Sequence, residues 1–503
     1  MRFERYEVLG RGSRGEYFSY RLCETEENEA SNFPVRKKPR LRLLQITDIQ
    51  LADPNSPNRF EFVNKLHDIA AARPFIPGHR PSELLTLHAA IAAVDRANSI
   101  HQEREVQVAL ITGDVIDSTQ LNEAKAALAI IEGGEVDPRK LFGDYQGVQS
   151  EAIDDPFYYK PDAADDLMGE LYGFPRIAGY LEATLRPQVS PGLSMPWLIA
   201  NGNHEVLVQG MGASNERANQ HAQGAKKPVA LTTDGIDFAA LAKRYEADAT
   251  ALAPLVTSIE INPLQRRRLL ADGEFGALIR VAKGLPLGHG LSTYTLGEMN
   301  YFWYFEDGNF AVVALDTANR AGGARGSFTE ECYLKLQEHL YAIKEHHPTA
   351  LIIVISHHSL EEIDFEASQV TEEQIEAIMS SYKVLLWLSG HTHKDRVITN
   401  VSNKDRTFIE VTSASIADWP ATIREVEIYD DVKEGTITVT LRSHMVSNGA
   451  SFTGRGEIET GQMSELLGIH SSIIANTASL YGLNIEESRL DAITIECDRD
   501  RYL

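Results

Sequence analysis

Short apolar runs that end abruptly in polar residues mark the chain between residues 41 and 393. Each run has the length of a buried strand, and stretches with helical spacing lie between the runs. This alternation is typical of an α/β core. The runs cover residues 41–46, 106–111, 197–200, 350–355 and 384–388. We predict a buried strand at each of them.

Regular alternation of apolar and polar positions predicts further strands. Residues 301–305 and 310–315, separated by a polar turn, predict a β-hairpin. Beyond residue 393, alternation is typical of antiparallel strands with one face on the core, and here it predicts a second sheet. Its predicted strands cover residues 407–411, 424–429 and 436–442.

The chain of 503 residues is long enough for about three domains or for one large domain with insertions. The strand pattern favours a main domain over residues 41–447. Within it, residues 118–196 and 206–300 lose the pattern, so we expect them to form a cap or specificity region over the strand ends. Residues 1–40 predict an irregular N-terminal arm, and residues 448–503 a C-terminal arm.

The net charge of the chain limits the classes of function that we expect for it. The chain has 48 Lys and Arg against 72 Asp and Glu, a formal net charge of −24. Proteins that coat nucleic acid need a basic stripe to release counterions, so we expect no stable nucleic-acid binding. The basic runs at residues 36–42 and 266–268 are short, and such runs are usually solvated faces.

The cysteines and apolar stretches bear on the compartment. Cys23, Cys332 and Cys497 form no CxxC pair, which fits a reducing compartment and argues against a zinc site built on sulfur. The N-terminus lacks the apolar core of an export signal. The most apolar stretch, residues 350–355, is far short of a membrane span. We therefore expect a cytoplasmic protein that does not associate with membranes.

Every predicted buried strand ends in side chains that can bind metal ions. The carboxyl ends of strands in an α/β sheet share one edge, so residues far apart in sequence can meet there. The polar groups are Thr47-Asp48-Ile49-Gln50, Gly113-Asp114-Val115-Ile116-Asp117, Asn201-Gly202-Asn203-His204-Glu205, Ser356-His357-His358 and Gly390-His391-Thr392-His393. Oxygen and imidazole ligands without thiolate suit Mn, Fe, Co or Zn, and so many histidines favour Mg less without excluding it. A central carboxylate can bridge two such metals and so build a site for a phosphoryl group.

Taken singly, each motif also fits an ordinary turn or a core histidine. Together and in this order they resemble the motifs of the calcineurin-like metallophosphoesterase superfamily, which are Asp-x-His, Gly-Asp-x-x-Asp, Gly-Asn-His-Asp/Glu, a lone His and Gly-His-x-His. The resemblance covers roughly residues 41–442 and leaves the two insertions unmatched. It implies an α/β fold, namely a four-layer α-β-β-α sandwich of two mixed sheets with inserted cap segments.

The resemblance also implies a role for each matched position. Asp114 would bridge two metals, and His204 would steady the transition-state oxygen or protonate the leaving group. Asp117 and Glu205 would contact and orient these residues without binding the metals themselves. The remaining implied metal ligands are Asp48 and His393 on the first metal, and Asn203, His357 and His391 on the second.

Two positions leave alternatives open. Gln50 stands where the family usually has His, and an amide oxygen is a weaker and harder ligand than imidazole. Gln50 therefore either binds the first metal weakly or only hydrogen-bonds a water molecule on it. His357 and His358 are both candidates for one ligand position, and the family pattern, which usually uses the first of such a pair, favours His357.

The implied activity is metal-dependent hydrolysis of a small phosphomonoester or phosphodiester. In a phosphatase or phosphodiesterase of this family, a metal-bridging hydroxide attacks phosphorus in line. The expected cofactors are two divalent ions, with Mn, Fe or Zn favoured, and the expected partner is the phosphoester itself. The alternative is a non-catalytic phosphoester-binding or scaffold protein with a degenerate first metal site, which Gln50 favours. His204 favours catalysis, because it would bind no metal and has no other reason to be retained.

Overall fold

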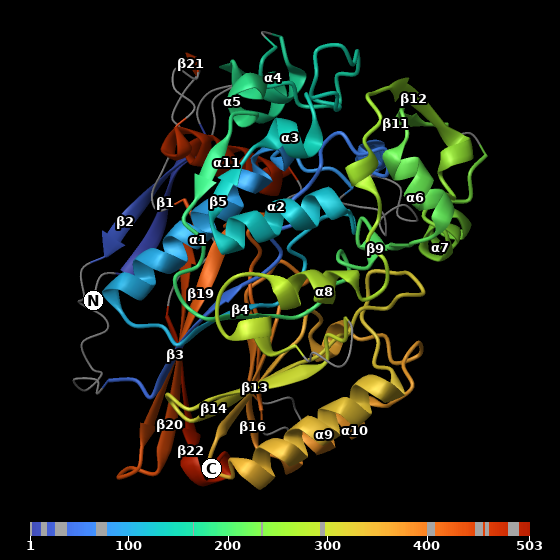
Figure 1. Cartoon of the computed structure of the whole chain (residues 1–503). Helices are drawn as coiled ribbons and strands as arrows, with labels where there is room; N and C mark the ends of the chain where they lie inside the picture. Colours follow the sequence, from blue (N-terminus) through green and yellow to red (C-terminus); the bar gives the residue numbers. More distant parts are fainter. Residues whose placement is uncertain are drawn as a thin grey trace.

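The computed structural model describes residues 3–11, 18–25, 38–66, 78–163, 165–232, 235–291, 297–399, 408–447, 456–457, 462–480 and 492–503. They form a mixed α/β fold with two six-stranded sheets, each containing parallel and antiparallel pairs (Figure 1). In this described part, no helix has both the length and the apolar character needed to cross a membrane.

The first sheet contains three of the predicted buried strands. β3 (Leu41–Ile46), β4 (Val108–Ile111) and β8 (Trp197–Ile199) pair in parallel. On the other side of β3 the sheet continues with antiparallel strands. These strands are β19 (Thr422–Asp431), β20 (Thr436–Met445) and β22 (Ile493–Asp498).

The second sheet contains the other two predicted buried strands, β15 (Leu351–Ile355) and β16 (Val384–Ser389). They pair in parallel with each other and with their outer neighbours β14 (Phe310–Ala314) and β18 (Ile409–Thr412). The antiparallel edge strands are β13 (Tyr301–Phe305) and β17 (Arg396–Ile398). The predicted hairpin is therefore confirmed as β13 and β14.

The predicted division into sheets is wrong. The alternating segments beyond residue 393 form no sheet of their own, because β18 pairs in parallel with β16 and β19 pairs with β3. The predicted strand 407–411 also starts one residue outside the described part of the chain. A period of two tells which face of a strand is buried, and it does not tell which strand lies beside it.

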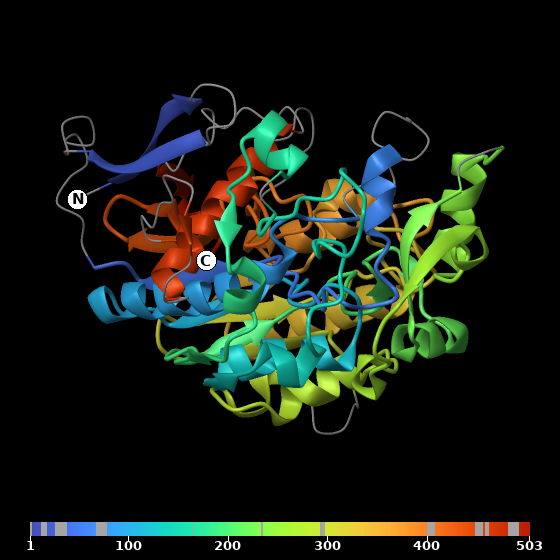
Figure 2. The ribbon, with the colours of Figure 1, turned by 90° about the horizontal axis from the view of Figure 1, so that it is seen from above.

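Both predicted arms contain β-strands that were not expected, whereas a helix around residues 464–483 was predicted. Within residues 1–40, β1 (Phe3–Arg11) and β2 (Phe18–Thr25) pair antiparallel, whereas the prediction was an irregular arm. Apolar residues at 18, 20 and 22 give β2 a strand pattern that is too short to weigh heavily in sequence. In the C-terminal arm, α11 (Met463–Leu480) is followed by β22, which belongs to the first sheet although the main domain was predicted to end at residue 447. Figure 2 shows β1, β2 and α11 together at one end of the molecule.

Helices cover both sheets. The helices α1 (Thr86–Glu103) and α2 (Leu121–Glu132) share one apolar cluster with both sheets. The helices α9 (Glu330–His346) and α10 (Glu372–Ser381) pack in a separate cluster on the second sheet. In β15 alternate residues enter the two clusters, so this strand is buried on both faces.

The two insertions carry short elements. The first contains β5 (Gly134–Val136), α3 (Pro138–Phe142), α4 (Leu167–Tyr172), β6 (Ile177–Ala178), α5 (Tyr180–Thr184) and β7 (Gln188–Ser190). The second contains β9 (Leu207–Val208), β10 (Gly212–Ala213), α6 (Glu216–Gln223), β11 (Lys226–Leu231), α7 (Phe238–Ala247), β12 (Val256–Glu260) and α8 (Glu274–Val281). β21 (Gly456–Glu457) pairs with β6. The elements β11, β12, α6 and α7 lie at the end of the molecule opposite β1 and β2 (Figure 2).

Candidate metal centre

The two sheets bring the predicted ligand groups to one place. Asp48, Asp114 and Asn203 follow β3, β4 and β8 of the first sheet, whereas His357 and His391 follow β15 and β16 of the second. Ligand atoms of Asp48, Asp114 and His357 all lie within 4.8 Å of one another. The sequence prediction of convergence therefore agrees with the geometry, although the shared edge is built from two sheets.

His357 links the two carboxylates. Its Nδ1 lies 2.8 Å from the carbonyl oxygen of Thr112, so this nitrogen carries the proton that it donates. Its Nε2 lies 2.9 Å from Oδ2 of Asp114 and 3.8 Å from Oδ1 of Asp48. Nε2 is buried, and no contact that it makes with a described residue has the geometry of a hydrogen bond. A ring nitrogen and two carboxylates that converge in this way are arranged as donors to a shared cation.

His393 is held from both sides. Its Nε2 lies 3.1 Å from Oδ1 of Asp48, and its Nδ1 lies 2.5 Å from Oδ2 of Asp418. Arg80 donates from Nε to the other oxygen of Asp418 at 3.0 Å. A carboxylate on the far nitrogen is how proteins fix the tautomer and orientation of metal-binding histidines.

The hydrogen bonds of His358 bear on the choice between His357 and His358 as a metal ligand. His391 donates its backbone N–H to Oδ2 of Asp48 at 3.0 Å, and its ring lies 5.2 Å from that of His357. His358 also lies near, and its nitrogens group with those of His357 and His391. However, His358 uses Nδ1 with the Thr317 hydroxyl at 2.8 Å and Nε2 with the Ala324 carbonyl at 3.0 Å. With both of its nitrogens engaged, His358 is the poorer ligand, which supports His357.

The loop after β8 wraps around Asp114. Asn203 donates from Nδ2 to the Gly210 carbonyl at 2.8 Å, and its Oδ1 is buried with no hydrogen-bond partner among the described residues. His204 donates its backbone N–H to Oδ1 of Asp114 at 2.9 Å. Glu205 accepts the backbone N–H groups of Asp114 at 2.8 Å and of Gly202 at 2.7 Å. The carboxylate of Glu205 therefore ties the second and third motifs together, as expected for a supporting residue.

The side chain of His204 faces Gln50. Nδ1 of His204 lies 2.5 Å from the carbonyl oxygen of Asp117, and Nε2 lies 3.2 Å from Nε2 of Gln50 and 3.8 Å from Oδ2 of Asp114. Oδ1 of Asn203 and Oε1 of Gln50 are buried acceptors that lack a partner among the described residues. Unpartnered oxygens beside carboxylates and imidazoles fit divalent cations, so the residues present suit the metals that the motifs imply.

Backbone strain is concentrated at the same positions. Asp48, Gln50, Asp114, His391 and His393 have φ values of 51°, 45°, 53°, 72° and 57°. Non-glycine residues in this region cost about 1–3 kcal/mol each and cluster at functional sites. Two glycines permit the close approach of these loops. A Cβ on Gly390 would lie 2.0 Å from Oγ1 of Thr47, and one on Gly202 would lie 2.1 Å from Oδ1 of Asp114.

The electrostatics of the cluster show tight pairing. Burial acts to lower the pKa of His357, but the charges of Asp114 and Asp48 prevail and raise it to about 10. Burial is likewise outweighed at His393, where Asp48 and Asp418 raise the pKa to about 9. The pKa of Asp48 falls below its usual range because His393 and His357 outweigh burial. The pKa of Asp114 falls likewise, because His357 and His204 outweigh burial. Metal ligands must be deprotonated, so a bound cation would take the place of the imidazole protons.

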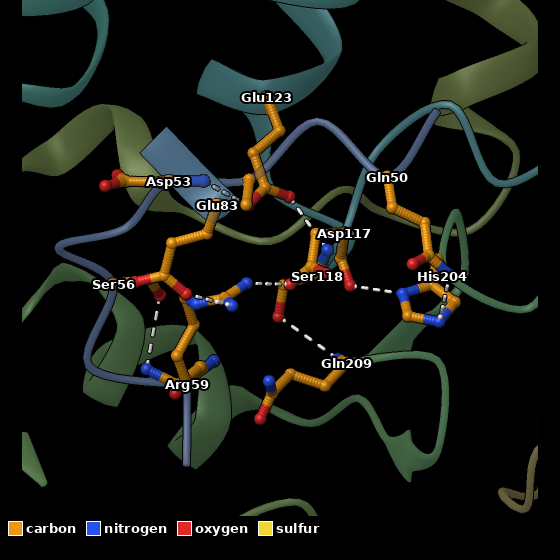
Figure 3. A network of polar contacts seen from close by, with 12 residues as sticks. Gln50, Asp53, Ser56, Arg59, Glu83, Asp117, Ser118, Glu123, His204 and Gln209 are labelled. Atoms are coloured by element: carbon orange, nitrogen blue, oxygen red, sulfur yellow. Dashed lines mark hydrogen bonds and ion pairs between the residues drawn. The ribbon is translucent and has the colours of Figure 1, made fainter. Parts of the chain in front are cut away.

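A buried network of charges supports the loop of Asp117 (Figure 3). Arg59 is 2% exposed, and its guanidinium binds the carboxylate of Asp117 and that of Glu83, the latter at 2.8 Å. The backbone carbonyl of Asp117 is the group that contacts His204. The network thus connects a buried arginine to the orientation of the predicted catalytic histidine.

Sequence reasoning missed Asp418, Arg80 and Arg59. Asp418 follows β18, which is parallel to β16, so it too lies beyond the carboxyl end of a parallel strand. The segment of β18, residues 407–411, was predicted to be an antiparallel strand, and the carboxyl end of such a strand does not lie at the shared edge. Arg59 and Arg80 lie in a stretch without periodicity, and nothing in its pattern indicates where these side chains point.

Comparisons with known proteins add little. No family model matches the chain, and no curated protein matches it. A solved structure described as "GAP50 the anchor in the inner membrane complex of Plasmodium" is similar with a TM-score of 0.30 and 9% sequence identity. That match covers 86% of this chain and 94% of the other. A likeness at this TM-score carries no argument about fold or function.

Proposed function

We propose that the chain is a metal-dependent phosphoesterase with a centre for two divalent cations, Mn, Fe or Zn. The observation that carries the proposal is the convergence of Asp48, Asp114 and His357, whose ligand atoms lie within 4.8 Å of one another. Proteins seldom bury two carboxylates this close together unless cations or hydrogen bonds compensate their charges. The unpartnered oxygens of Asn203 and Gln50 supply the further donors that such cations need.

The order of the motifs supports membership of the calcineurin-like metallophosphoesterase superfamily. The layering supports it as well, since α1 and α2 lie against one side of the paired sheets and α9 and α10 against the other (Figure 1). We interpret this arrangement as the four-layer α-β-β-α sandwich of that family. On this interpretation the two insertions, which follow β4 and β8 in the chain, would form the specificity region.

The chemistry follows from the positions of the side chains. Bound cations would supply Lewis-acid stabilisation of the phosphoryl oxygens and a water molecule activated near pH 7. Asp48, Asp114 and His393 would hold them in place, with Asp114 shared. His204 is 13% exposed and keeps Nδ1 on the Asp117 carbonyl, so any proton it gives to a leaving oxygen comes from Nε2.

Hydrolysis of two model esters tests the proposal. Metal-stripped protein should gain turnover of p-nitrophenyl phosphate or bis-p-nitrophenyl phosphate when Mn²⁺ is restored, and Asp114→Asn should lower it about a hundredfold or more. Asp272→Asn, which changes an exposed carboxylate, is the matched control and should retain full activity. Tight metal binding without turnover of either ester would instead favour the phosphoester-binding or scaffold protein, the alternative that Gln50 supports.

A further inference from the structure

Arg80 is fixed beside the candidate metal centre by a single bond. Its Nε donates to Oδ1 of Asp418 at 3.0 Å, while Oδ2 of the same carboxylate holds His393. The side chain of Arg80 is 12% exposed. The guanidinium and the imidazole therefore share one carboxylate, and the guanidinium lies next to a predicted metal ligand.

The two terminal nitrogens of Arg80 have no partner in the described part of the chain. They make no hydrogen bond or ion pair with any described residue, although a guanidinium offers five donor hydrogens. Arg267 and Arg59, which are both buried, differ in this respect. Arg267 engages Nε with Asp53 and both terminal nitrogens with backbone carbonyls, and Arg59 engages both terminal nitrogens with carboxylates. Arg80 thus presents an unused pair of donors at a partly open position.

Two carboxylates near the centre act on the charge of Arg80. Burial acts to lower its pKa, but the carboxylates of Asp418 and Asp117 raise it, so the guanidinium stays charged. The carboxylate of Asp418 contacts the ring of His393, and the backbone carbonyl of Asp117 contacts the ring of His204. The guanidinium of Arg80 is therefore tied by geometry to the carboxylate that holds His393.

We propose that the terminal nitrogens of Arg80 bind terminal oxygens of the substrate phosphate and that the centre consequently prefers phosphomonoesters to phosphodiesters. This inference rests on the proposed function and deepens it. Arginine binds charged terminal oxygens in a two-pronged fashion, and ester oxygens are poor acceptors for it. A monoester has three terminal oxygens that share nearly two charges near pH 7, whereas a diester has two that share one. A free guanidinium in addition to the metal ligands therefore favours the monoester.

The test compares Arg80→Gln with wild type and with Arg139→Gln, which changes a partly exposed arginine paired with Asp144 and Glu182. In the Mn²⁺-loaded chain, Arg80→Gln should weaken the binding of inorganic phosphate, measured by calorimetry, about 10–100-fold. It should raise KM for p-nitrophenyl phosphate by a similar factor and change bis-p-nitrophenyl phosphate hydrolysis less than about threefold. Arg80→Lys should recover part of the loss, and Arg139→Gln should match wild type in every assay.

Two results would overturn the assignment. Unchanged phosphate binding in Arg80→Gln would show that the free nitrogens do not contact the phosphate. Weaker Mn²⁺ binding, together with equal losses on both esters, would show that Arg80 acts only through Asp418. If the wild type hydrolyses neither ester, the proposed activity fails, but the phosphate titration still decides whether Arg80 binds the anion.

Discussion

The carboxylate of Asp418 lies 2.5 Å from Nδ1 of His393, although the two residues are 25 positions apart in the chain. The opposite nitrogen of the same ring lies 3.1 Å from Asp48. A carboxylate bound to one ring nitrogen fixes the tautomer and raises the basicity of the other. Asp418 therefore prepares Nε2 of His393 to act as a ligand, and this role can be measured separately from hydrolysis.

Asp418→Asn should weaken Mn²⁺ binding about 10–100-fold, because His393 loses the partner that orients it. Calorimetric titration of the metal-stripped chain measures this change directly. Asp272→Asn, at an exposed carboxylate, should bind Mn²⁺ as the wild type does. Equal affinities in wild type and Asp418→Asn would contradict the supporting role of Asp418.

Gln50→His should make the first metal harder to remove. Gln50 now offers an amide, and an imidazole at the same position binds borderline divalent metals more strongly. The loss of Zn²⁺ to a chelator should slow about tenfold or more in the variant. Gln220→His, on the exposed surface of α6, is the matched control and should leave the rate unchanged. Faster loss of metal from Gln50→His would show that Gln50 does not face the first metal.

Lys227→Met should destabilise the chain by about 3–5 kcal/mol, because it leaves a carboxylate buried without its lysine partner. Nζ of Lys227, in the second insertion, lies 2.6 Å from Oε1 of Glu61, and both side chains are fully buried. Urea unfolding measures the change in the free energy of unfolding. The neighbouring Lys226 is exposed, and Lys226→Met should cost less than about 0.5 kcal/mol. Similar values for the two variants would mean that the buried pair does not hold the insertion in place.

The buried histidine His88 should make stability depend on pH. Burial, and then the nearby His470, lower its pKa from 6.5 to about 3, and neither ring nitrogen has a hydrogen-bond partner among the described residues. Between these two values the unfolded chain binds a proton that the folded chain refuses, so stability falls as the pH falls below about 6.5.

Replacing His88 by Met removes this titration. Between pH 7 and pH 5 the wild type should lose about 2 kcal/mol more of its free energy of unfolding than His88→Met does. Urea unfolding at several pH values measures the difference. His346→Met, at an exposed position of α9, should follow the wild type. Parallel curves for wild type and His88→Met would contradict a neutral, buried His88.

The five buried strands and the polar residues at their ends could be predicted from the sequence, and the reason is physical. A strand buried on both faces must be apolar throughout, as β15 and β16 are, and the polar residue that follows it stands out. Pairing between strands leaves no such mark, so β18 and β19 were assigned to the wrong sheet. Asp418 was missed as a direct consequence of that error.

Long-range charge pairing was also invisible in sequence. The run 266–268 was interpreted as a solvated face, but Arg267 is 2% exposed and donates from Nε to Asp53 at 2.7 Å. The partner lies 214 positions away, so no local pattern could indicate it. Lys227 and Arg59 show the same limit. Each is buried and pairs with a carboxylate that only the fold brings near it.

Metal stoichiometry tests the central claim most directly. The number of Mn²⁺ ions bound per chain can be counted by equilibrium dialysis and metal analysis of wild type, Asp114→Asn and Asp272→Asn. The account predicts two ions per chain in wild type and in Asp272→Asn, and fewer in Asp114→Asn, which lacks the shared carboxylate. A wild-type chain that binds no Mn²⁺, Fe²⁺ or Zn²⁺, or an Asp114→Asn chain that binds as many ions as wild type, would contradict it.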